Sequence, residues 1–352
     1  MTTSVANESR IIGADPDLEE VVEALYAAGP ADPWAASLRA ELPWVGISEE
    51  AGGVGGTVGD QVAIARAIGR HAVSAPVVES HLAARVLGAF GEDVPHVAMA
   101  FTLGDRRDRI TVARDTLTGT LHGVAWARDA DLLTAVLTTD DGLLACVAEP
   151  TDVEVSAGAD LAGQPLDTVS VRRARVLGPL PDEVLPGARH ALLRAAQIAG
   201  AIEACATLTN QYVWTREQFG RPVGSFQAVQ AHLVTLEQAA VASRLVVQQA
   251  AHAIEVEGES RSRFEAAAAF VVTDHHAGLA AAAAHQAHGA IGMTLEYPLA
   301  GLTRRLHSWR GLGARHRNGV DHFGRDAIAY GSVAALVQRE TGQQGPTARR
   351  EQ

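Results

Sequence analysis

Apolar residues recur at helical spacing through the first and last parts of the chain. The first part predicts helices over 15–28, 33–42, 58–73 and 77–90. Asp15 and Pro16 suit the cap and first turn of the earliest helix. The last part predicts long helices over 185–219, 226–255 and 261–288, then a shorter segment and a final helix near 318–339. Long helices with short connections indicate an antiparallel bundle.

The middle of the chain has a different pattern, with short β-branched or alternating runs separated by Asp, Gly and Pro. Strands are predicted over 97–103, 109–112, 117–121, 132–139, 143–148, 153–155 and 169–171. Their spacing indicates a small antiparallel barrel or sandwich. The fold class is therefore α+β, mostly α. It comprises an N-terminal helical domain (1–92), a middle β domain (93–178), a C-terminal four-helix bundle (179–340) and a tail predicted to be disordered (341–352).

The turn between the first two bundle helices contains an unusual number of residues that could bind a ligand. Arg216 and Arg221 carry guanidinium groups that match phosphate or carboxylate oxygens. Phe219 offers a ring for stacking, and Gly220 and Pro222 shape the turn. A solvated charged loop remains the alternative at this point.

Composition limits the classes of function. The chain has 352 residues and a formal net charge of −12, which argues against non-specific nucleic-acid binding but not against a local anion site. Cys146 and Cys205 form neither a metal-ligand spacing nor a disulfide framework. Residues 1–10 do not resemble a signal peptide, and charged or polar residues interrupt the apolar stretches. We expect a soluble cytoplasmic protein with no membrane or nucleic-acid partner.

Several motifs in order along the chain resemble one family. The turn reads REQFGRPVGSFQ over Arg216–Gln227, and HQAHGAIGMT follows at His285–Thr294. Glu296–Leu299 and Arg304–Leu306 continue the match, and Pro43–Gly56 resembles the family's P-E-E-x-G-G-x-G turn with Ser48 in place of the proline. Together with the order of helical, β and bundle parts, these motifs resemble the acyl-CoA dehydrogenase family.

The resemblance implies a flavoprotein that oxidises acyl-CoA thioesters at the α,β carbons with FAD and passes electrons to an electron-transfer flavoprotein or another acceptor. In this family, one subunit lends its bundle turn to an FAD held mainly by its neighbour. Arg216 then matches the pyrophosphate contact and Phe219 the ring beside the adenine. Other matched contacts to the ADP half are Gln227, Gln286, Ala287, His288, Gly289, Ala290 and Gly292, where Ala290 replaces a common glycine.

The family's catalytic base is missing from both places where it normally lies. One position falls in 309–314, most nearly at Gly313, and the other near Arg189 and His190. Neither holds a carboxylate, so no catalytic residue is assigned. His190 remains an alternative base on general grounds.

The middle domain also departs from the family. The segment 101–108 lacks the Gly-Ser-Asp turn, and 124–129 keeps Trp126 but lacks the following hydroxyl residue. The half of the FAD site within one subunit therefore looks degraded, whereas the half lent across the interface looks intact. The chain most resembles the non-catalytic subunit of heteromeric actinobacterial steroid dehydrogenases, active only in a heterotetramer. Two alternatives remain: a self-sufficient homo-oligomeric dehydrogenase with an unusual base, and a non-enzymatic scaffold of the same fold.

Two further patterns carry less weight. Among the histidines of 275–288, His285 and His288 could share a helical face, but no nearby Glu or Cys completes a ligand set, so no metal is predicted. The glycines of 52–56 resemble a dinucleotide-binding loop, yet no strand precedes them. They are predicted to form a flexible connector.

Overall fold

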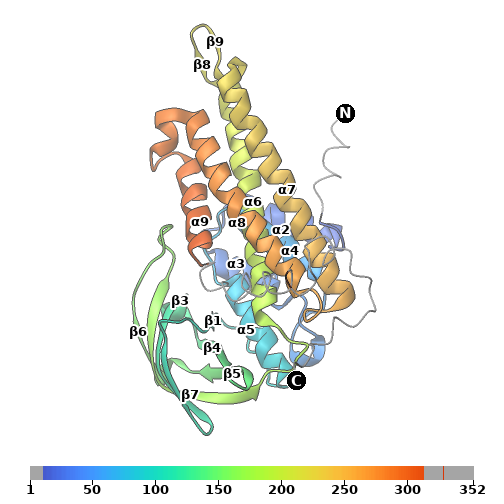
Figure 1. The fold of residues 1–352 in the computed structure, drawn as a ribbon, viewed down its shortest axis with the longest axis vertical. Coiled ribbons are helices and arrows are strands. Elements are labelled where there is room, and N and C mark those ends of the chain that lie inside the picture. Colours follow the sequence, from blue (N-terminus) through green and yellow to red (C-terminus); the bar gives the residue numbers. More distant parts are fainter. Residues whose placement is uncertain (1–10, 313–327, 329–352) are drawn as a thin grey trace.

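The computed structural model describes residues 11–312 and residue 328. The predicted final helix over 318–339 falls almost wholly, and the predicted disordered tail wholly, outside the described residues, as does Gly313. The N-terminal helices lie at the centre of the molecule and a curved β-sheet lies at its lower end (Figure 1). The helix bundle extends upward from the centre. The α+β, mostly helical fold class is confirmed.

From residue 11 onward, the N-terminal part contains four helices: α2 (Pro16–Ala27), α3 (Pro33–Arg39), α4 (Val58–Arg70) and α5 (Val77–Ala89). Each lies where the sequence predicted it. Asp15 caps α2 by accepting a hydrogen bond from the backbone N–H of Asp17 at 2.9 Å, and Pro16 occupies its first turn. The helix α4 packs closely on the bundle, because a Cβ at Gly69 would lie 1.9 Å from the carbonyl oxygen of Gln197.

The segment between α3 and α4 is a compact turn, which corrects the prediction of a flexible connector. It contains the 3-10 turns η1 (Leu42–Trp44) and η2 (Glu49–Ala51). Trp44 is fully buried. The backbone N–H of Gly55 donates to the carbonyl of Ile47 at 2.8 Å, and a Cβ at Gly53 would lie 2.3 Å from that same oxygen. The glycines therefore serve close packing.

Seven strands form one mixed sheet, and each overlaps a predicted strand. They are β1 (Met99–Leu103), β2 (Arg109–Ala113), β3 (Thr116–Ala125), β4 (Leu132–Thr139), β5 (Gly142–Ala148), β6 (Val153–Ser156) and β7 (Leu166–Pro179), with 3-10 turns η3 (Ala127–Asp129) and η4 (Pro150–Asp152) between them. The order is β1-β4-β5-β7-β3-β2, and β6 pairs with β7. β1 runs parallel to β4, whereas the sequence predicted antiparallel pairing throughout. The other pairs are antiparallel.

Up to residue 312, the bundle contains α6 (Pro186–Thr215), α7 (Gln227–Glu257), α8 (Arg263–His288) and α9 (Pro298–Leu312). A small hairpin of β8 (Glu217–Gln218) and β9 (Arg221–Pro222), followed by η5 (Val223–Ser225), joins α6 to α7. The turn η6 (Gly289–Met293) follows α8. In Figure 1 the hairpin forms the tip of the bundle, at the opposite end from the sheet.

The helix α6 sets the distance between the sheet and the tip. Its first turn lies beside the sheet, because a Cβ at Gly187 would lie 3.9 Å from Leu103 of β1. With 30 residues it is about 45 Å long. This helix is also long and apolar enough to cross a membrane, although no such stretch was expected from the sequence; 78% of its most apolar window is buried in the bundle. It is the core helix of the bundle.

Candidate functional site

The tip hairpin holds a phenylalanine in a strained and exposed position. Arg216 leaves the helical conformation with φ −84° and ψ 120°, which ends α6. Phe219 and Gly220 form the two-residue loop and both have positive φ, at 54° and 77°. Such a loop suits the twist of a tight hairpin, but positive φ is costly for a bulky residue. Phe219 is 91% exposed. An unfavourable backbone conformation at Phe219 therefore accompanies the outward position of its side chain.

A pocket of about 660 Å³ lies beside this hairpin. The end of α6, the hairpin, the start of α7 and the junction of α8 with η6 form its walls. Seven of the nine predicted cofactor residues line it: Arg216, Phe219, Gln286, Ala287, His288, Gly289 and Ala290. Segments about 70 residues apart in the sequence thus meet where the motifs predicted a shared site. Gln227 and Gly292 are not among the lining residues.

An aromatic stack supports one wall of the pocket. The rings of Tyr212 and His288 lie 4.4 Å apart and 20° from parallel. The hydroxyl of Tyr212 donates to the carbonyl of His288 at 3.3 Å, and Tyr297 approaches edge-on with its ring centroid 6.0 Å from that of Tyr212. Tyr212 was not assigned to the site from the sequence. Its place one helical turn before Arg216 was the available signal.

His288 offers a hydrogen-bond acceptor inside this wall. Its Nδ1 lies 2.9 Å from the carbonyl oxygen of Ala284, which can only accept, so Nδ1 carries the proton. Burial lowers the pKa of His288, which keeps the ring neutral at pH 7. Nε2 is therefore an acceptor, and it is buried without a hydrogen-bond partner in the protein.

The two predicted glycines differ in their surroundings. Gly289 has φ 64°, and a Cβ there would meet nothing within 4 Å, so a ligand can approach its backbone closely. A Cβ at Gly292 would lie 2.8 Å from the Cβ of His288 and 3.2 Å from Leu299. Gly292 is thus required to seat η6 against α8.

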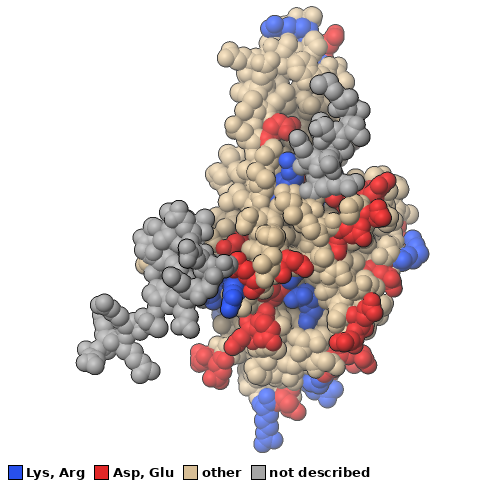
Figure 2. Space-filling view, turned by 90° about the vertical axis from the view of Figure 1, so that its right-hand side faces the viewer, with Lys and Arg blue, Asp and Glu red and all other residues tan. Residues whose placement is uncertain are grey.

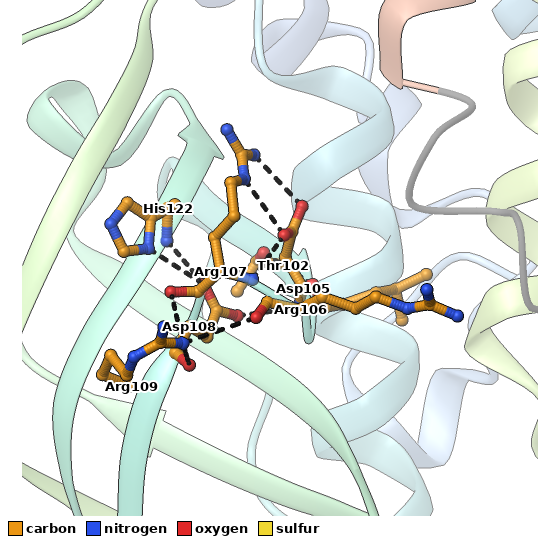
Figure 3. A network of polar contacts seen from close by, with 8 residues as sticks. Thr102, Asp105, Arg106, Arg107, Asp108, Arg109 and His122 are labelled. Atoms are coloured by element: carbon orange, nitrogen blue, oxygen red, sulfur yellow. Dashed lines mark hydrogen bonds and ion pairs between the residues drawn. The ribbon is translucent and has the colours of Figure 1, made fainter.

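The turn after β1, where the family's Gly-Ser-Asp would lie, satisfies its own polar groups (Figure 3). Arg107 Nε donates to Asp105 Oδ1 at 3.1 Å. Asp108 accepts from the backbone N–H of Asp105 at 2.7 Å and from that of His122 at 2.8 Å. The hydroxyl of Thr102 is turned back to the carbonyl of Leu103 at 3.2 Å. The carboxylates of this turn are occupied by contacts within the β domain.

Of the two positions where the family's catalytic base normally lies, the one near Arg189 and His190 falls within the described residues. Both of these side chains make contacts inside the protein. Arg189 is 4% exposed and its Nε donates to Glu259 at 2.9 Å. His190 Nε2 lies 3.3 Å from Arg194 Nη2, and the ring of His190 meets that of Phe101 edge-on at 6.0 Å. The lone pair of Nε2 thus accepts from a guanidinium instead of being available to abstract a substrate proton.

The histidines of α8 make separate contacts. His276 Nδ1 lies 3.2 Å from the hydroxyl of Ser243, and His285 Nε2 lies 3.0 Å from that of Thr303. Over the part of the chain that the structure describes, no group of three or more His, Cys, Asp or Glu side chains gathers to hold a metal.

Comparisons with known proteins show which family and fold the chain resembles. Residues 188–313 match the family described as acyl-CoA dehydrogenase, C-terminal domain. Acyl-CoA dehydrogenase IpdE2 of Mycobacterium tuberculosis is 28% identical, with 74% of this chain and 75% of that protein covered. Acyl-CoA dehydrogenase FadE27 of the same organism is 32% identical, with 58% of this chain and 61% of that protein covered. The ChsE4–ChsE5 complex of Mycobacterium tuberculosis contains a chain with a TM-score of 0.79 at 22% identity, covering 97% of this chain and 99% of that one.

Proposed function

The chain belongs to the acyl-CoA dehydrogenase family, and we propose that it completes the FAD site of a catalytic partner subunit in a heteromeric enzyme. The cofactor of this family is FAD. The tip pocket would hold the ADP half of that FAD, and the partner would hold the flavin ring and supply the base. The observation that carries the proposal is the gathering of seven motif residues in one pocket far from the chain's own sheet.

The distance along α6 supports a cofactor shared between subunits. The pocket lies at the C-terminal end of α6, whereas the sheet lies at its N-terminal end, about 45 Å away. One dinucleotide cannot contact both. A cofactor seated in the tip pocket therefore places its flavin ring against another subunit.

The pocket chemistry fits the ADP half of FAD. Arg216 brings a permanent positive charge to a diphosphate, a charge-assisted contact that strengthens as water is excluded. Phe219 offers an exposed face for a purine ring. Gly289 permits a phosphate or ribose to approach the backbone. When bound, FAD supplies the hydride acceptor for α,β-dehydrogenation; this chain's residues bind and orient it.

The outer face of the bundle supports association with another subunit. Four exposed apolar residues of α7 recur at whole helical turns: Val234, Val241, Leu245 and Val256, which are 42–67% exposed. In Figure 2 the upper part of the face carries fewer charged side chains than the lower part, apart from the basic ones at the tip. A stripe of exposed apolar residues is typical of a subunit interface.

The half of the FAD site that lies within one subunit argues against a self-sufficient dehydrogenase in this chain. The turn after β1 uses its carboxylates internally, and the described base position holds Arg189 and His190. We further propose that the complex is a cytoplasmic heterotetramer that acts on acyl-CoA thioesters in steroid degradation and passes electrons to an electron-transfer flavoprotein. The similar ChsE4–ChsE5 complex supports the heteromeric part of this proposal, and the similar acyl-CoA dehydrogenase IpdE2 supports the acyl-CoA substrate.

Purification with and without a co-expressed catalytic acyl-CoA dehydrogenase subunit tests the proposal. Flavin absorbance and acyl-CoA oxidation should appear together in the complex, and the chain alone should lack both. Stoichiometric FAD and activity in the chain alone would establish a homo-oligomeric dehydrogenase instead. A complex that forms without any effect of this chain on flavin content would establish a scaffold.

A further inference from the structure

Arg221 lies on the tip hairpin, close in sequence to Arg216, but in different surroundings. Arg216 lines the tip pocket, whereas Arg221 is not among its lining residues. Arg221 begins β9 and pairs with Gln218 of β8 across the hairpin. The FAD contact proposed for Arg216 therefore leaves Arg221 without a role.

The guanidinium group of Arg221 lies over the ring of Phe226. Its Cζ is 4.2 Å from the ring centroid, well within the range of a cation–π contact. Among the residues that the structure describes, this ring is the only partner of the guanidinium group. An exposed arginine without an ion pair has many conformations open to it, so the contact with Phe226 is what selects this one.

Phe226 connects Arg221 to the tip pocket, because Phe226 is one of the residues that line it. The backbone of Phe226 is fixed at the start of α7. Its N–H donates to the carbonyl of Val223 at 3.2 Å, and its carbonyl accepts from the N–H of Gln230 at 3.0 Å. Its side chain is half-buried. A neighbouring ring can therefore be oriented against it.

Phe219 depends on Phe226 for the orientation of its ring. The two rings meet edge-on, with their centroids 6.1 Å apart and their planes at 84°. In the described part of the chain this is the only ring contact of Phe219. Aromatic pairs favour this geometry, whereas an exposed phenylalanine without a neighbour samples several rotamers. The contacts thus form a chain from Arg221 through Phe226 to Phe219.

We propose that Arg221 is a positioning residue that, through Phe226, holds the ring of Phe219 ready to stack on the adenine of FAD. This inference rests on the proposed function, in which the tip pocket holds the ADP half of FAD. A ring that is already oriented loses less conformational freedom on binding, which raises the affinity. The charge of Arg221 acts on the ring of Phe226, whereas that of Arg216 acts on the diphosphate.

The dissociation constant of FAD from the complex with the catalytic partner, measured after flavin is removed and added back, tests this role. Arg221→Met should weaken FAD binding about 3-fold to 5-fold, because it removes the cation–π contact. Arg221→Lys keeps a cation and should bind FAD within about 2-fold of the unaltered complex. Arg39→Met is the matched control, since Arg39 is an exposed arginine of α3, away from the tip. It should leave the affinity unchanged. Unaltered affinity with Arg221→Met would overturn the proposal.

A double-mutant cycle separates positioning from a direct contact of Arg221 with FAD. In a Phe219→Leu complex the stacking ring is gone, so the addition of Arg221→Met should cause no further loss of affinity. Both residues are exposed, and neither substitution removes a buried side chain. If Arg221 contacted the diphosphate, its substitution would cost as much without the ring as with it, and the positioning role would be refuted.

The proposed function and the role of Arg221 fail in different ways. An Arg216→Ala complex that keeps all its FAD would contradict the proposed function, and the role of Arg221 with it. A complex that loses FAD with Arg216→Ala but is unaffected by Arg221→Met would contradict only the role of Arg221.

Discussion

Phe219 shows how one residue carries functional information. Its left-handed backbone and 91% exposure are both unfavourable in an isolated chain. Its ring meets Phe226 only edge-on, with the centroids 6.1 Å apart. The sequence predicted a ring for stacking here because Phe219 lies among arginines and glycines in a turn. It could not predict the acceptor at His288, since that depends on a bond to Ala284 and on burial.

Gly292 provides a prediction at the residue scale. Gly292→Ala should destabilise the protein by about 1–3 kcal/mol, because the new methyl group would lie 2.8 Å from the Cβ of His288. Gly301→Ala is the matched control, since a Cβ at that helical position meets nothing within 4 Å. It should be neutral or slightly stabilising. Urea unfolding measures both, and an unchanged midpoint for Gly292→Ala would refute the packing role.

At the scale of elements, the sequence located each strand but not their pairing. The β-branched runs between Asp and Gly turns mark where β1 to β7 lie, because local preference decides strand formation there. The parallel pairing of β1 with β4 depends on the path of the chain between them. In the same way, the helical spacing located α6, α7 and α8, whereas the outward apolar stripe of α7 became visible only once the bundle had buried its other face.

The stripe of α7 gives a prediction for association. Val241→Glu should dissociate this chain from its partner subunit, because it places a charge in an apolar interface. Val21→Glu on α2 is the control, since Val21 is 56% exposed and Val241 is 42% exposed, and the chemical change is the same. Size-exclusion chromatography of the complex measures the effect. A complex that survives Val241→Glu would exclude this face from the interface.

At the scale of the whole molecule, buried ion pairs fix the N-terminal helices to the bundle. Arg66 of α4 donates to Glu203 of α6 at 2.9 Å across 137 positions of sequence. Glu259 accepts from Arg189, Arg85 and the backbone N–H of Leu185. Composition and periodicity could not predict such pairs, because tertiary proximity alone selects the partners. These contacts hold α6 against the N-terminal helices. The tip pocket lies at the C-terminal end of this helix, away from the sheet.

The central claim is that this pocket serves a cofactor held by another subunit. The most direct test measures FAD per complex after co-purification of Arg216→Ala with the catalytic partner. Glu217→Gln is the matched control, since Glu217 lies on the same hairpin outside the pocket lining. We expect an intact complex that loses most of its FAD with Arg216→Ala and keeps it with Glu217→Gln. Full FAD occupancy and activity in the Arg216→Ala complex would contradict the claim.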